Sequence, residues 1–95
     1  MALLLMTHFY PQGTKEQYLV VLNAVHPTGE LPPGQFSSAA GPTEGGWLIS
    51  SIWESRVAYD TFVRDTLMPV LAGVTGGFNS APEERLAECV VYQTA

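Results

Sequence analysis

The segment that most constrains the fold of this chain runs from the glycine pair Gly45–Gly46 to Leu71. Glycine adopts positive φ angles without steric cost, so the pair predicts a turn. Residues 47–53 are rich in aromatic and β-branched side chains, which predicts a β-strand packed on at least one face. Ser55 then offers a helix N-cap, and a stripe at helical spacing follows it. The stripe consists of Tyr59, Phe62, Val63, Thr66, Leu67 and Val70. We therefore expect a strand that leads directly into a capped amphipathic helix.

The first part of the chain predicts a strand and then a helix. Residues 2–10 contain a continuous apolar run, which is typical of a central strand covered on both faces. Thr14 and Gln17 have the spacing of a capping box, so we expect a helix to begin there. It should end at His26, because the residue before a proline is disfavoured in the α conformation.

Between this helix and the glycine pair, the sequence predicts a loop and a hairpin. Residues 28–34 are rich in proline and glycine and predict the loop. Residues 35–40 are small apart from one phenylalanine and predict a weak second strand. We expect residues 41–45 to form the hairpin loop into the third strand.

The last part of the chain predicts the end of the second helix and a final strand. Pro69 should kink or end the helix, with residues 70–74 as a short continuation. Residues 75–82 predict a loop. Residues 85–94 are expected to form the fourth strand, with an apolar centre made by Cys89, Val90, Val91 and Tyr92.

The element order is therefore β-α-β-β-α-β within one domain, residues 1–95. This order predicts an α+β fold of the ferredoxin-like type, in which a four-stranded antiparallel sheet carries both helices on one face. The other face would hold residues such as Leu48 and Ile52, or their neighbours, and would have no helix over it. Only 14% of the residues are charged and 46% are hydrophobic, whereas soluble domains carry roughly 25% charged residues. We therefore expect a homodimer that buries this face.

Charge and cysteine content exclude several classes of protein. The net charge of −5 and the scattered basic residues argue against nucleic acid or an anionic membrane as partner. The single cysteine, Cys89, rules out an intramolecular disulfide, and two histidines without neighbouring acidic or thiol ligands do not make a zinc site. We expect no metal and no cofactor. The apolar start is too short for a signal segment, so a cytoplasmic protein is expected.

The run from Gly45–Gly46–Trp47 to Trp53–Glu54–Ser55, followed by Ala58–Tyr59 and Phe62, resembles a known pattern. It is similar to the dimeric α+β barrel superfamily, which includes the antibiotic-biosynthesis-monooxygenase-like domains. The resemblance implies a dimer whose two sheets face each other. It also implies a pocket between the sheet and helices of each protomer, with Trp53 in its wall.

Two catalytic signatures of that superfamily are absent at the matching positions. Quinone-forming, cofactor-free monooxygenases carry an asparagine four residues before the tryptophan, where this chain has Ile49. Polyketide cyclases carry a histidine near the end of the second helix, and residues 65–68 contain none. Many relatives also have a histidine in the second strand, where residues 37–40 are Ser and Ala.

Seven residues are candidates for a site. His8 and His26 are the candidate catalytic residues, because a histidine side chain with an ordinary pKa of about 6.5 exchanges protons at neutral pH. The alternative for His26 is an interaction with the helix C-terminus. The candidate substrate-binding residues are Trp47, Ser51, Trp53, Tyr59 and Phe62. These five could instead be core residues.

Two functions remain open from the sequence. The first is a small cofactor-independent enzyme, monooxygenase- or cyclase-like, that acts on an aromatic or polyketide-like molecule with His8 as the base. The second is a non-catalytic homodimer that uses the same pocket for binding or its surface as a scaffold. Catalysis needs a base within hydrogen-bonding reach of the ligand, whereas binding needs only the aromatic wall.

Overall fold

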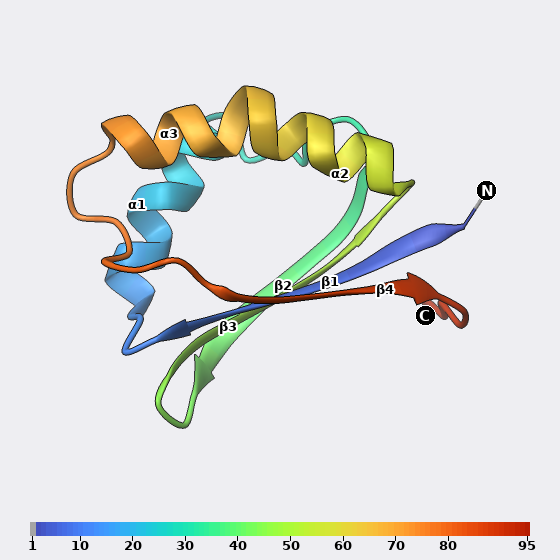
Figure 1. Cartoon of the computed structure of the whole chain (residues 1–95), viewed down its shortest axis with the longest axis horizontal. Helices are drawn as coiled ribbons and strands as arrows, with labels where there is room; N and C mark the ends of the chain where they lie inside the picture. Colours follow the sequence, from blue (N-terminus) through green and yellow to red (C-terminus); the bar gives the residue numbers. More distant parts are fainter. Residues whose placement is uncertain (1) are drawn as a thin grey trace.

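The structure, a computed structural model, describes residues 2–95; Met1, the first residue of the expected domain, lies outside the described residues. Its elements follow the order expected from the sequence (Figure 1). They are β1 (Leu3–Pro11), α1 (Lys15–Val25), β2 (Gln35–Thr43), β3 (Gly46–Trp53), α2 (Arg56–Phe62), the π-helical turn η1 (Val63–Leu67), α3 (Met68–Gly73) and β4 (Glu83–Cys89). The strands form one antiparallel sheet in the order β2-β3-β1-β4. This is the expected α+β, ferredoxin-like fold.

Both helices begin at the capping residues that the sequence indicated. The Thr14 hydroxyl accepts a hydrogen bond from the Gln17 N–H at 3.2 Å, and the Gln17 side chain accepts one from the Thr14 N–H at 3.0 Å. The Ser55 hydroxyl accepts from the Ala58 N–H at 3.1 Å. Each cap therefore satisfies N–H groups that have no partner inside the helix, which fixes where α1 and α2 start.

The second helix runs from α2 through η1 to α3 without a break in helical backbone geometry. Pro69 lies in the first turn of α3 and cannot donate a hydrogen bond to the turn before it. In η1 the hydrogen bonds widen, and the Met68 N–H donates to the Val63 carbonyl five residues earlier. The expected disturbance at Pro69 is thus a π-helical turn just before the proline, and the helix then continues to Gly73.

The β2–β3 hairpin depends on the glycine pair. Gly45 has a φ of +84°, a conformation that favours glycine. A Cβ atom on Gly46 would lie 2.1 Å from the Tyr10 carbonyl oxygen, so only glycine permits β3 to approach the end of β1 this closely. The hairpin turn is shorter than expected, because residues 41–43 continue β2 rather than forming a loop.

Strand alternation divides the sheet into two faces. The face under the helices, called the covered face below, contains Leu4, Met6, His8 and Tyr10 of β1, which are at most 7% exposed. The opposite face, called the open face below, contains the intervening residues of β1 and carries Leu48, which is 42% exposed. Figure 1 shows the helices gathered on one side of the sheet.

The expected fourth strand was placed too late in the sequence. β4 spans Glu83–Cys89, so Val90, Val91 and Tyr92 lie outside the sheet. Their side chains are 84%, 72% and 41% exposed, so they do not form the expected apolar centre of a strand. The shift matters for function because it brings Glu84 into the sheet.

Candidate functional site

The candidate site is a cavity of about 70 Å³ between the covered face and the helices. Its wall is made mostly of aromatic and aliphatic side chains from β1, β3, α1, the second helix and the loop after α3. The lining residues are Met6, His8, Tyr10, Tyr18, Val21, Leu22, Val25, His26, Gln35, Ile49, Trp53, Tyr59, Phe62, Leu67 and Phe78. Among residues 2–95, none that lines this cavity is Lys, Arg, Asp or Glu.

His8 lies at the centre of the covered face and is 5% exposed. The strand register places it beside Ile49 of β3 on one side and Glu84 of β4 on the other. Its Nε2 atom is 2.8 Å from Glu84 Oε2 and 3.0 Å from the Tyr59 hydroxyl. The imidazole is therefore held by hydrogen bonds to two other elements while it forms part of the cavity wall.

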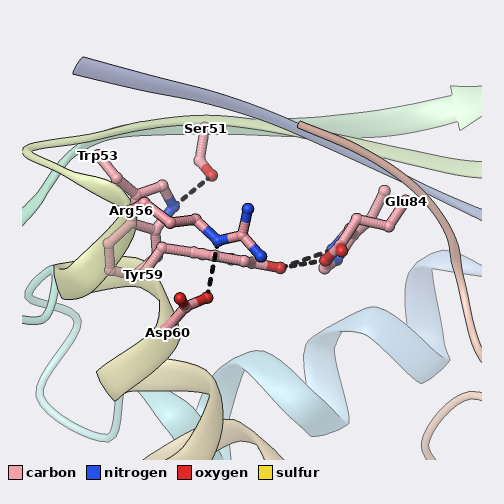
Figure 2. A network of polar contacts seen from close by, with 7 residues as sticks. Ser51, Trp53, Arg56, Tyr59, Asp60 and Glu84 are labelled. Carbon is pink, nitrogen blue, oxygen red and sulfur yellow. Dashed lines mark hydrogen bonds and ion pairs between the residues drawn. The ribbon is translucent and has the colours of Figure 1, made fainter. Parts of the chain in front are cut away.

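Tyr59 and Glu84 complete this polar cluster. The Tyr59 hydroxyl donates a hydrogen bond to Glu84 Oε2, and Figure 2 shows the tyrosine side chain reaching from α2 toward the carboxylate. Burial, followed by the hydrogen bond and the charge of Glu84, raises the pKa of Tyr59 well above its ordinary value. Partial burial raises the pKa of Glu84, but the hydrogen bonds from Tyr59 and His8 outweigh it, so the pKa lies below its ordinary value. At neutral pH the cluster thus contains a neutral phenol and a carboxylate.

Trp53 forms the aromatic wall at the end of β3. It is 1% exposed, and its ring lies edge-on to Tyr59 with centroids 5.4 Å apart and tilted against Phe62 at 5.0 Å. The indole N–H donates to the Ser51 hydroxyl at 2.8 Å, as Figure 2 shows. Because its one polar atom is already bonded, Trp53 offers the cavity an apolar surface.

His26 lies at the other side of the cavity, at the C-terminal end of α1. Its ring is nearly parallel to that of Phe62, with centroids 6.2 Å apart. Burial lowers the pKa of His26, and this effect is only partly offset by the backbone of Glu30. The neutral imidazole is therefore favoured here, with no side-chain hydrogen bond to it among residues 2–95.

Five of the seven candidate residues line the cavity, and two do not. Ser51 lies behind the wall as the hydrogen-bond acceptor of Trp53. Trp47 is 5% exposed and packs against Tyr18 with ring centroids 5.3 Å apart, at the other end of β3. The five that the structure brings together are His8, His26, Trp53, Tyr59 and Phe62.

Sequence reasoning missed Glu84, Tyr10 and Phe78 as parts of the site. Tyr10 shares the His8 face of β1, and Phe78 stacks on it with parallel rings 3.7 Å apart. The sequence carried a signal for Tyr10, because side chains alternate along β1 and place Tyr10 on the same face as His8. Glu84 is 76 residues from His8 in sequence, and only the register of β1 with β4 brings them together.

Neither metal clusters nor membrane-spanning helices are found in the part of the chain that the structure describes. Within residues 2–95, no three His, Cys, Asp or Glu side chains gather in a way that could hold a metal ion. None of the helices in that range combines the length and apolar character needed to cross a bilayer.

Comparison with known proteins shows likeness in structure but not in sequence. No protein-family model matches the chain, and no curated protein matches it. A candidate antibiotic biosynthesis monooxygenase from Chloroflexus aurantiacus superposes with a TM-score of 0.69 at 10% identity, over 98% of each chain. The chain has the fold of this protein.

Two Streptomyces oxygenases share the fold as well. The monooxygenase ActVA-Orf6 of Streptomyces coelicolor, solved with the ligand nanaomycin D, has a TM-score of 0.61 at 19% identity, over 99% of this chain and 92% of its own. SnoaB of Streptomyces nogalater, a cofactor-independent oxygenase, has a TM-score of 0.58 at 10% identity, over 97% and 94%. The expected resemblance to antibiotic-biosynthesis-monooxygenase-like domains is thus confirmed as a likeness in fold.

Proposed function

We propose that this chain is a small cofactor-independent enzyme, monooxygenase- or cyclase-like, that acts on an aromatic or polyketide-like molecule. One observation carries the proposal. A buried histidine, His8, forms part of an aromatic cavity wall and is hydrogen-bonded to the carboxylate of Glu84, which lies outside the cavity. Proton abstraction needs a base held within reach of the substrate, and an acidic partner can hold a histidine in this way. The fold shared with two oxygenases supports the same reading.

The lining of the cavity favours a flat, uncharged ligand. Trp53, Phe62 and Phe78 present ring surfaces that suit stacking against an aromatic system. An anionic ligand would enter without a cationic side chain to pair with it, and it would meet the field of Glu84 behind His8. A neutral phenol avoids this cost until its proton is removed inside the site.

The first chemical step is transfer of a proton from a phenolic hydroxyl to His8. The products are a phenolate and an imidazolium, and the positive imidazolium then lies beside the Glu84 carboxylate. If dioxygen is the co-substrate, oxidation of a phenol to a quinone places one oxygen atom on the ring. The other leaves as water with two hydrogens from the phenol, so atoms and electrons balance without an external reductant. A cyclase-like reaction would instead begin with transfer of a C–H proton next to a carbonyl group to His8, and it needs no dioxygen.

The size of the cavity sets a further requirement. Pockets for drug-sized ligands are about 300–1,000 Å³, whereas this cavity is about 70 Å³. Phe78 closes one side of it from a loop at residues 74–82, where it stacks on Tyr10. Movement of this loop would open the site to a multi-ring ligand.

The alternative function is a non-catalytic homodimer that binds a small molecule or serves as a scaffold. Ile49 supports it, because this residue lines the cavity beside His8 at the position where the oxygenase resemblance implies an asparagine. For both functions we propose the same homodimer, which forms through the open face of the sheet. The two functions differ in whether His8 is needed for turnover or only contributes to the wall.

The experiment is to screen the chain against phenols and hydroxylated polyketide-like compounds, recording product formation and dioxygen uptake, and then to compare His8→Gln with wild type. Loss of a general base should lower kcat by about 10²–10⁴-fold. His26→Gln is the matched variant on the other wall, where the ring lacks a carboxylate partner, and its effect on kcat should be much smaller. A folded His8→Gln variant with wild-type turnover would exclude His8 as the base. Binding of these compounds by the wild type without any turnover would exclude the enzymatic proposal and favour the binding protein.

A further inference from the structure

A single carboxylate oxygen receives two hydrogen bonds in the polar cluster behind the cavity. Glu84 Oε2 is 2.8 Å from His8 Nε2 and also accepts the hydroxyl proton of Tyr59. The three side chains come from β4, β1 and α2. Glu84 is 42% exposed at its side chain, whereas His8 is 6% exposed at its own, so the carboxylate contacts the imidazole from the solvent side of the cluster.

Hydrogen-bond chemistry fixes the direction of both protons. An ionised carboxylate only accepts, so the Tyr59 O–H and the His8 Nε2–H must both point at Glu84. The Tyr59 hydroxyl has one proton, and once that proton is directed to Glu84 its oxygen faces His8 only as an acceptor, at 3.0 Å. The lowered pKa of Glu84 and the raised pKa of Tyr59 agree with these protonation states.

A neutral imidazole carries one proton, so a proton on Nε2 leaves a lone pair on Nδ1. Within residues 2–95, Nδ1 of His8 forms no hydrogen bond, and the ring forms part of the cavity wall. We propose that Glu84 is a positioning residue that holds His8 in the Nε2–H tautomer and so leaves Nδ1 as the atom that accepts the substrate proton. The role of Nδ1 toward a substrate rests on the proposed function, but the tautomer of His8 can be measured without any reaction.

The two neighbours of Nε2 have opposite effects on the tautomer. Glu84 can only accept, which favours the proton on Nε2. Without Glu84, the Tyr59 hydroxyl would instead donate its proton to His8 Nε2, which is 3.0 Å away. A phenol donating to Nε2 requires a lone pair there, which moves the imidazole proton to Nδ1 and removes the base from the cavity. Glu84 therefore acts by directing Tyr59 away from His8 as well as by accepting from His8.

The test is ¹⁵N NMR of the histidine rings in the full chain, at a mildly alkaline pH, which favours the neutral form of a histidine side chain. The chain has two histidines, so a His26→Gln variant assigns the signals. Wild type and Tyr59→Phe should both show the Nε2–H tautomer for His8, because Glu84 is present in each. Glu84→Ala should show the Nδ1–H tautomer. Glu83→Ala is the matched control, since Glu83 pairs with Phe9 on the open face, and it should match wild type.

The Nδ1–H tautomer in wild type, or an unchanged Nε2–H tautomer in Glu84→Ala, would overturn the proposal. The wild-type spectrum alone decides the first point, so the test does not depend on the folding of a variant. Turnover separates this inference from the proposed function. Glu84→Ala should lower kcat by about 10²-fold with little change in KM, because the base presents the wrong nitrogen. If the tautomer switches as expected while His8→Gln retains full turnover, the positioning of the ring is supported and the role of His8 as the base is contradicted.

Discussion

The two faces of the sheet use the same strands for different purposes. On the covered face, β1 contributes Met6, His8 and Tyr10, all at most 6% exposed, and the one histidine among them is bonded to two neighbours. On the open face, the same strand contributes Leu5 and Phe9, which are only half-buried, and no histidine. Because side chains alternate along a strand, a single stretch of sequence can supply a chemical site and an apolar surface without mixing them.

The contrast extends to β3. Trp53 and Ser51 on the covered face are each 1% exposed, and their side chains form a hydrogen bond with each other. Leu48 on the open face is 42% exposed. A half-exposed apolar sheet face is a surface that association would stabilise. Ligand binding and self-association should therefore respond to different substitutions.

The largest expected effect is on the covered face, in Trp53→Ala. The substitution removes a fully buried ring that packs on Tyr59 and Phe62 and leaves the Ser51 hydroxyl without its donor. It should lower the free energy of unfolding by about 3–5 kcal/mol, toward the low end because the ring already borders a cavity. Urea denaturation measures this. Val57→Ala, at a side chain 74% exposed on α2, should change it by less than about 0.5 kcal/mol. Equal losses in the two variants would contradict the assignment of the core to this face.

The second effect is on the open face, in Leu48→Glu. We predict a homodimer that buries about 1,500 Å² or more in total. A carboxylate in the centre of that interface would be desolvated without a partner, so the variant should be a monomer at concentrations where wild type is a dimer. Light scattering gives the mass. Val57→Glu places the same charge on the helix side and should leave the dimer intact; a wild-type monomer at micromolar concentration would contradict the interface.

The smallest expected effect concerns the pH dependence of stability through Glu84. Its pKa is lower in the folded chain than its ordinary value of 4.5, so the carboxylate stabilises the fold above that pH. This contribution is lost as the pH falls through the lowered pKa. Because the side chain is 42% exposed, we expect no more than about 1 kcal/mol. Thermal melts should show Glu84→Gln less stable than wild type at neutral pH, with a gap that closes in acid. Glu83→Gln should show no such closing gap.

Most of the fold could be predicted because its signals are local. Thr14 with Gln17 and Ser55 marked the helix starts, and Gly45 marked the hairpin turn, since each acts on backbone groups within a few residues. The end of β4 was misplaced because Val90 and Val91 have the composition of a strand but have no partner strand to pair with in the described sheet.

The candidate site was only partly predictable because its decisive contact is not local. His8, Trp53 and Tyr59 were found from residue type and periodicity. Glu84 could not be found in this way, because its role depends on the strand order β1-β4 and on a register that places it opposite His8. The separation of Ser51 from the cavity was also hidden, since only side-chain geometry shows that it bonds to the indole of Trp53.

The central claim is that the covered face holds the ligand site, with His8 in its wall. The most direct test is to add a phenol that binds in the screen to ¹⁵N- and methyl-labelled protein and to map the changed NMR signals. We expect changes at the rings of His8, Trp53 and Phe62, with the methyl groups of Leu48 and Ile52 unchanged. Changes confined to Leu48 and Ile52, with a constant His8 signal, would place the ligand on the open face and contradict a site on the covered face.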